Sequence, residues 1–129
     1  MIFNLLISGP LYSSQSAYSA LKFARAAVSK GHTISQVFFY QDGVSNANQL
    51  SNPLSDEFDS VSTWQAFAKE NGIPLVACIS SAERRGIVDD ELASEVSSFA
   101  GNLAQGFEIA GLGTLHEASI SSDRTVTFK

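Results

Sequence analysis

The sequence predicts a three-layer α/β fold, in which a mostly parallel β-sheet carries helices on both faces. Short apolar runs alternate along the chain with amphipathic stretches, and this alternation is typical of parallel β–α units. The chain has 129 residues and a hydrophobic fraction of 44%, which fits one compact domain over residues 1–129 better than two. No repeat, linker or low-complexity tract divides the sequence.

The first forty residues predict a strand, a helix and a second strand. Ile2–Ile7 is an apolar run ended by Ser8-Gly9-Pro10, which indicates a buried strand and a turn. Ser13 and Ser14 are candidate caps for the helix that Gly31 is placed to end. The buried stripe expected for this helix, at helical spacing, is Ala17, Ala20, Leu21, Ala24 and Val28. Thr33–Tyr40 is β-branched and aromatic and predicts the second strand.

The middle of the chain predicts a long loop, a helix and a third strand. Gln41–Pro53 is rich in Asn, Ser and Gly, and a loop of this length is uncommon unless it serves function or assembly. Ser55 is a candidate cap for the next helix, with Asp56 and Glu57 favourable at its positive end. The apolar face expected for this helix comprises Phe58, Val61, Trp64 and Phe67 or Ala68, and Gly72 and Pro74 end it. Pro74–Ile79 is the third predicted strand.

The remainder of the chain predicts three helices and two short strands. Ser80-Ser81 is the expected cap of a short helix through Arg85, and Asp89 or Asp90 is the expected cap of the next. The stripe expected for that second helix is Leu92, Val96, Phe99 and Leu103. The last three expected elements are a strand at Phe107–Ala110, a helix from Gly111 to Ile120 and a strand at Thr125–Phe128.

Composition excludes several classes of protein. The net charge is -5 and no run of Lys or Arg forms a basic stripe, which argues against direct binding to nucleic acid. A single cysteine excludes an intrachain disulfide and a metal site built from several thiolates. The N-terminus does not resemble a signal peptide, and no apolar run approaches the roughly 20 residues that span a bilayer, so we expect a cytoplasmic protein without membrane association.

The charged fraction of the sequence points to partner subunits. At 16% it lies below the usual share of about 25%. A surface with so few charges is expected to be partly covered in an assembly, although a plain monomer can also have this composition.

The candidate functional residue is Cys78. It sits at the carboxyl end of the third predicted strand, and in an open parallel sheet the chemistry gathers at the carboxyl ends of strands. The expected helix N-terminus beyond it favours an anion, which is the reactive thiolate form of cysteine. Arg84 and Arg85 follow closely and are candidates for electrostatic support. By position alone, Cys78 also fits a small, inert residue of the core.

Other candidate sites carry weaker signals. A thiol hydrolase needs a base beside its cysteine, but His32 is expected at the opposite end of the sheet and His116 within the last helix. The loop Ser8–Gln15 joins a strand to a helix and could cradle a phosphate, but it has one glycine and no lysine, so we favour an ordinary turn. The carboxylate pairs Asp56-Glu57 and Asp89-Asp90 are expected to be helix caps rather than catalytic acids.

The same residues resemble the DsrE/TusD family of sulfurtransferases nearly from end to end. The phrase from Phe38 through Leu50, followed by Cys78 and then two arginines, is fairly specific. The other matching segments are Ser8–Tyr12, Ser55–Asp59, Trp64, Arg84–Gly86, Asn102-Leu103, Gly106-Phe107 and Gly111–Ala118. One departure is Ser13, where the family often has glycine.

The resemblance implies a three-layer, flavodoxin-like (DsrE-like) fold and a sulfur-relay activity in which Cys78 is the active-site cysteine. It implies a TusA-like protein as donor of persulfide sulfur and a TusE-like protein as acceptor, with the sulfur used for 2-thiolation of the tRNA wobble uridine by a separate enzyme. It further implies assembly with TusB-like and TusC-like subunits into a heterohexamer, and no cofactor.

Three alternatives remain open from the residues. A DsrE-like subunit of sulfur oxidation would use the same cysteine in the opposite metabolic direction. A noncatalytic assembly subunit would hold Cys78 only as a structural residue. A flavin-binding electron carrier would share the architecture but contain flavin. The relay differs from the last two in needing an accessible thiolate, since each transfer is an exchange between sulfur atoms.

Overall fold

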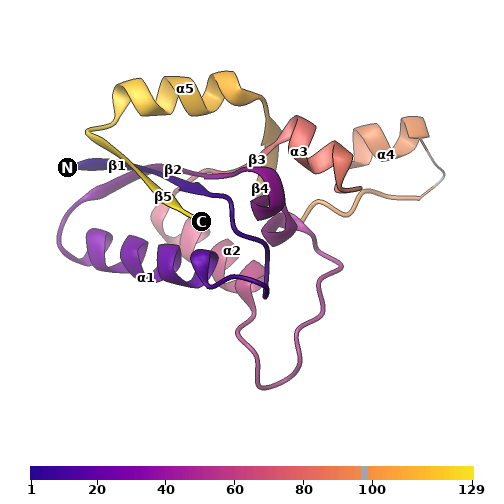
Figure 1. Ribbon diagram of the computed structural model, residues 1–129, viewed down its shortest axis with the longest axis horizontal. Coiled ribbons are helices and arrows are strands. Elements are labelled where there is room, and N and C mark those ends of the chain that lie inside the picture. The colour runs from indigo at the N-terminus through magenta and orange to yellow at the C-terminus, as the bar shows by residue number, and fades with distance from the viewer. Residues whose placement is uncertain (97–98) are drawn as a thin grey trace.

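A five-stranded, wholly parallel sheet forms the centre of the protein (Figure 1). The structure is a computed structural model that describes residues 1–96 and 99–129. The strands lie in the order β4-β3-β2-β1-β5. Their bounds are β1 Ile2–Ile7, β2 Thr33–Phe39, β3 Leu75–Cys78, β4 Phe107–Ala110 and β5 Arg124–Phe128. All five strands were predicted, with small differences at their ends, and the α/β fold class is confirmed.

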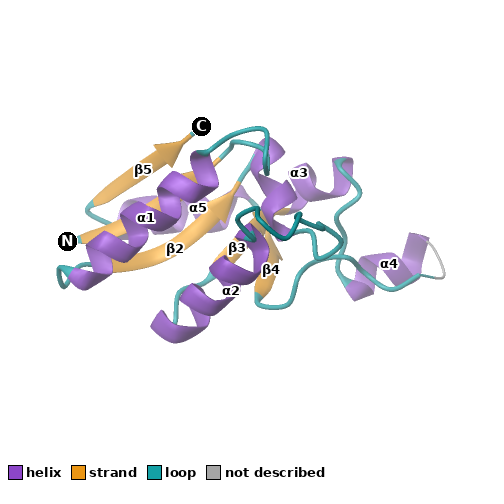
Figure 2. Ribbon diagram, turned by 90° about the horizontal axis from the view of Figure 1, so that it is seen from below, coloured by secondary structure: helices purple, strands orange, loops and turns teal. Residues whose placement is uncertain are grey.

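Helices cover both faces of the sheet, as expected for a three-layer fold. The helices α1 (Ser16–Ser29) and α2 (Ser60–Asn71) lie on one face, and α5 (Leu112–Ser121) lies on the other (Figures 1 and 2). Two short helices, α3 (Ile79–Arg84) and α4 (Asp90–Val96), follow β3, and α4 lies away from the sheet. Among the described residues, no helix combines the length and the apolar character needed to cross a bilayer.

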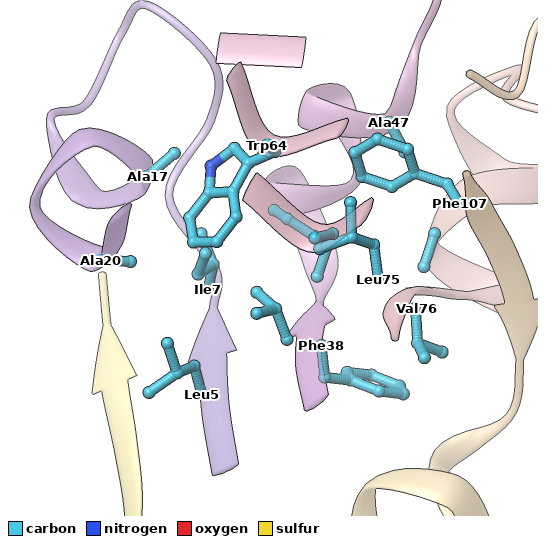
Figure 3. Packing of buried hydrophobic residues seen from close by; sticks show 14 of the residues in the cluster. Leu5, Ile7, Ala17, Ala20, Phe38, Ala47, Trp64, Leu75, Val76 and Phe107 are labelled. Atoms are coloured by element: carbon cyan, nitrogen blue, oxygen red, sulfur yellow. The ribbon is translucent and has the colours of Figure 1, made fainter. Parts of the chain in front are cut away.

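The main core lies between the sheet and the pair α1 and α2 (Figure 3). Small residues of α1, such as Ala20 and Ala24, are fully buried and let the helix approach the sheet closely. Trp64 of α2 is also fully buried, and its ring meets Phe39 edge-on at 5.9 Å between centroids. Trp64 also meets Phe67 of the same helix, at 6.1 Å between ring centroids. Through its contact with Phe39, Trp64 joins α2 to the sheet.

The face of the sheet beneath α5 is packed differently. None of the residues of α5 is buried, whereas Asn4 of β1 and Gln36 of β2, neighbours in register, are almost completely buried. The Asn4 Nδ2 group donates to Ser119 Oγ and Thr125 Oγ1, both at 3.2 Å. The helix α5 is therefore held by a polar contact at Ser119 together with the partly buried Leu115, which packs against the core.

The predicted starts of the first two helices are wrong. The first helix begins at Ser16 after Gln15, and the Ser14 hydroxyl accepts the Ser16 N–H at 3.0 Å instead of capping as predicted. The second helix begins at Ser60 and is capped by Asp59, not by Ser55. The Gly31 and Gly72 stops are confirmed, and both glycines have positive φ angles.

The long segment after β2 is more ordered than a loop. Its first part, Gln41–Ala47, forms a 3₁₀ helix, η1, with Val44, Asn46 and Ala47 fully buried. Gly43 lies directly against the backbone of Ile7, where a β-carbon has no room. The prediction of an open loop over Gln41–Pro53 is therefore wrong for its first half, because this segment covers the ends of the central strands.

The stripe predicted for the helix after Asp89 is also wrong. Asp89 does cap α4, through a 2.9 Å bond from the Leu92 N–H, and the described part of this helix runs from Asp90 to Val96. Val96 is 69% exposed and Phe99 is 79% exposed, and residues 97–98 lie outside the described residues. The chain turns back instead, because the amides of residues 102 and 103 both donate to the Val88 carbonyl.

The packing of Trp64 predicts a large effect on stability. Trp64→Ala is expected to lower the free energy of unfolding by about 3–5 kcal/mol, because it removes a fully buried aromatic ring and leaves a cavity. Urea unfolding measures the change. Leu50→Ala is the control, since this side chain is 71% exposed and its loss is expected to cost less than about 0.5 kcal/mol. Equal losses in the two variants would contradict the assigned core.

Candidate functional site

Cys78 is the residue at which β3 becomes α3. It is the last residue of the strand and also the N-cap of the helix, with an extended backbone at φ −61° and ψ 124°. The helix therefore begins at Ile79, directly after the cysteine, and the predicted Ser80-Ser81 cap is wrong. The position at the carboxyl end of a central strand is as the sequence predicted.

The Cys78 side chain is fully buried, with an exposed fraction of 0%. The two residues that follow it reach the surface, since Ile79 is 43% exposed and Ser80 is exposed as well. The expectation of an accessible thiolate is therefore not met in the isolated chain. Access to the sulfur requires movement of the groups around it.

Hydrogen-bond donors surround the buried sulfur. Burial by itself raises the pKa of the Cys78 thiol, but hydrogen bonds from the Ser80 and Ser81 side chains and from their backbone amides lower it. The Ser80 hydroxyl lies 3.5 Å from the sulfur. The donors outweigh burial, so the pKa of Cys78 is lowered from its ordinary value and the thiolate is favoured.

The two predicted arginines differ in their surroundings. Arg85 forms an ion pair with Asp42 of η1, at 3.0 Å between Nη2 and Oδ1. Arg84 lies exposed at the end of α3. The pKa of Cys78 is raised by burial and lowered by the two serines, and neither guanidinium is among the causes. Electrostatic support from Arg84 and Arg85 stays a prediction.

Two residues beside this site were not predicted to have a role at Cys78. Ser81 is 4% exposed, and its hydroxyl accepts the Gln41 N–H at 3.0 Å. Asp42 holds Arg85, whose Nη1 donates to the Ser81 carbonyl at 3.1 Å. Ser81 had a signal in the sequence, as a presumed helix cap, but Asp42 had none because it is separated from Cys78 along the chain.

The other candidate groups lie elsewhere. His32 Nδ1 pairs with the N-terminal amine of Met1 at 2.9 Å, which places His32 at the amino end of the sheet. His116 is exposed on α5. Within residues 1–96 and 99–129, no three His, Cys, Asp or Glu side chains form a group able to hold a metal ion.

The loop after β1 borders a cavity of about 360 Å³. Its lining includes the aromatic side chains of Tyr12, Tyr18 and Phe58. Burial raises the pKa of Tyr12, and the nearby carboxylates of Asp59 and Glu57 raise it further. The expectation of an ordinary turn over Ser8–Gln15 stays a prediction.

The amino-acid sequence of this chain is similar to those of known proteins over nearly its whole length. The family model described as "DsrE/DsrF-like family" matches residues 1–128. A protein named Sulfurtransferase TusD from Photorhabdus laumondii is 51% identical over 124 residues, which cover 96% of this chain and 95% of that protein. Sulfurtransferase TusD from Cronobacter sakazakii is 47% identical over 128 residues, which cover 99% of this chain and all of that protein.

A solved structure shares the fold. The crystal structure of the ychN protein from E. coli superposes with a TM-score of 0.76 and covers 99% of each chain. The sequence identity is 21%, so this likeness supports the architecture and carries no argument about function.

The lowered pKa of Cys78 predicts a shifted pH profile. The rate of alkylation by iodoacetamide is expected to rise with pH around a midpoint below that of the same chain unfolded in denaturant, because the fold favours the thiolate. Only the midpoints are compared, since burial slows the absolute rate in the folded chain. A folded midpoint at or above the unfolded one would contradict the assigned hydrogen bonds.

The serine hydroxyl nearest to the sulfur predicts the effect of its removal. Ser80→Ala is expected to raise the alkylation midpoint by about half to one pH unit, because one donor to the thiolate is lost. Ser94→Ala is the matched control, since this serine bonds to the Glu91 carbonyl on α4. The hydrogen-bond assignment fails if the two variants have the same midpoint.

Proposed function

This chain belongs to the DsrE/DsrF-like family, and on that premise we propose that it is a sulfurtransferase of the relay that supplies sulfur for tRNA thiolation. The proposal assigns Cys78 as the sulfur carrier. The two relatives named Sulfurtransferase TusD support the activity, and each matches nearly the whole chain. The finer target, the 2-position of the wobble uridine, is part of the proposal.

The observation that carries the assignment is the environment of the only cysteine. Cys78 lies at the carboxyl end of β3 and receives hydrogen bonds from Ser80 and Ser81, so a negative sulfur is stabilised there. A persulfide is also an anion at neutral pH, and the same donors stabilise its terminal sulfur. The site therefore suits both the empty and the loaded carrier.

The proposed transfer needs one nucleophile and no cofactor. The Cys78 thiolate attacks the outer sulfur of a donor persulfide, and a new sulfur–sulfur bond forms as the bond within the donor breaks. The donor's electron pair leaves with its own sulfur as a thiolate, so no net oxidation occurs. An acceptor thiolate then attacks the outer sulfur on Cys78. The acceptor forms a new sulfur–sulfur bond, the bond to Cys78 breaks, and Cys78 is released as a thiolate.

Burial of the sulfur sets a condition on this mechanism. A donor thiol has to reach Cys78, whose exposed fraction is 0%, through the surface formed by Ile79 and Ser80. We propose that docking of a partner moves the side chains of Ile79 and Ser80 and so exposes the sulfur. These two residues are exposed, whereas Ser81 and Ala82 beyond them are buried.

The proposed partners follow from the family. A TusA-like donor and a TusE-like acceptor exchange sulfur with Cys78, and TusB-like and TusC-like subunits join this chain in a heterohexamer in the cytoplasm. Large apolar side chains on the surface support an assembly, and they include Leu112 and Ile120 of α5 and Val96 of α4. The composition supports it too, since only 16% of the residues are charged.

A noncatalytic assembly subunit is the second candidate, and the full burial of Cys78 favours it. A subunit of sulfur oxidation stays open as well, because it would use the same chemistry. A flavin carrier has less support, since the two relatives reported above are both named Sulfurtransferase TusD.

Sulfur loading tests the proposal directly. The purified chain is expected to gain the mass of one sulfur atom after exposure to a persulfide donor, and Cys78→Ser is expected to gain none, because the chain has one cysteine. Intact-protein mass spectrometry measures the gain, and dithiothreitol should remove it. Wild type that stays unloaded, both alone and with its partner subunits, would favour the assembly role.

A further inference from the structure

We propose that Asp42 is a positioning residue for Cys78, because it holds Arg85, and Arg85 together with η1 holds Ser81 beside the sulfur. The inference rests on the proposed role of Cys78. It adds Asp42 to the site, a residue that follows β2 and not β3. We refer to Asp42, Arg85 and Ser81, together with the backbone of Gln41, as the η1–α3 clamp.

The outer half of the clamp is a fork-shaped ion pair. Both Nε and Nη2 of Arg85 lie 3.0 Å from Oδ1 of Asp42, and the third guanidinium nitrogen, Nη1, donates to the Ser81 carbonyl at 3.1 Å. The guanidinium is planar, so fixing two of its nitrogens on Asp42 fixes the direction of the third. The side chains are 35% and 63% exposed, and an isolated pair at such a position contributes little to stability. Its effect is on geometry.

The inner half of the clamp orients the Ser81 hydroxyl. Ser81 Oγ accepts the Gln41 N–H at 3.0 Å, and the side chain is 4% exposed. A hydroxyl that accepts from one side retains its proton for donation on another. The neighbouring Ser80, on the same turn of α3, has its hydroxyl 3.5 Å from the Cys78 sulfur. Holding Ser81 in place therefore also holds Ser80, the hydroxyl nearest to the sulfur.

The donors stand on α3, a short helix of six residues. The burial of Ser81 and Ala82 holds its inner side, and the contacts with η1 hold it from the outside. The segment η1 follows β2, the neighbour of β3, and is anchored by buried residues such as Val44 and Asn46. Contact with η1 thus transfers the rigidity of the sheet to the first turn of α3.

The direction in which replacing Asp42 shifts the pKa of Cys78 distinguishes a positioning role from a direct effect of its charge. The charged side chains on the elements packed against Cys78 are Asp42 on η1, Glu83 and Arg84 on α3, Arg85 after it and Glu108 on β4. Removing the negative charge of Asp42 lowers the pKa of a nearby thiol if charge acts directly. It raises the pKa if Asp42 acts by holding the donors in place.

The experiment measures the pH profile of Cys78 alkylation by iodoacetamide in the full chain. Asp42→Asn is expected to raise the midpoint by roughly half a unit, which is about a threefold loss of thiolate at neutral pH. Glu83→Gln is the matched control, since it removes the same charge from α3 without touching the clamp, and its midpoint should stay or fall. An Asp42→Asn midpoint that is unchanged or lower overturns the proposal.

A double substitution gives a second, independent readout. Arg85→Gln alone should raise the midpoint, and adding Asp42→Asn should raise it no further, because both changes break the same contact. Additive shifts would refute the clamp. Urea unfolding of each variant shows whether it is folded, and exposed Asp42 is expected to be replaceable without loss of the fold. No sulfur donor is used, so this outcome is independent of the loading test, and either proposal can fail alone.

Discussion

The chemistry of this protein depends on one constraint, namely that a single residue ends a strand and starts a helix. Cys78 closes the β3 ladder opposite Ala110 and caps α3, so its side chain lies where the sheet meets free amide donors. The strand buries the sulfur, and the amides and hydroxyls of the next residues compensate for that burial. A thiol elsewhere on β3 would have the burial without the donors, because the amides along a strand are used in the sheet.

The two faces of the sheet are packed by different kinds of side chain. The face beneath α1 and α2 is filled with aliphatic and aromatic side chains, with Trp64 and Phe39 at its centre. The face beneath α5 has buried polar groups, and α5 leaves apolar side chains such as Ile120 in solvent. Leu115 of α5 packs against the core, while the exposed apolar side chains of this helix are the surface that the proposed assembly would use.

The segment η1 connects the core of the protein to α3, the helix beside Cys78. It is anchored in the core through Val44 and through the Asn46 amide oxygen, which accepts the Ser60 hydroxyl at 2.9 Å. Its outer residues reach α3, where Asp42 meets Arg85. A stretch that composition describes as a polar loop is therefore the physical link between the rigid sheet and the small helix that carries the donors.

The sequence by itself determined the strands, the fold class and the position of Cys78 near a strand end, because these follow from local patterns such as the apolar run Pro74–Ile79 and its stop at Ser80-Ser81. It misplaced the caps at Ser13, Ser55 and Ser80, since several neighbouring polar residues have similar capping propensity and packing selects among them. Only the tertiary structure decided that the sulfur is buried and that Asp42 lies beside Arg85. Those facts arise from contacts between segments far apart in the chain, and no local periodicity records which distant groups the folded backbone brings together.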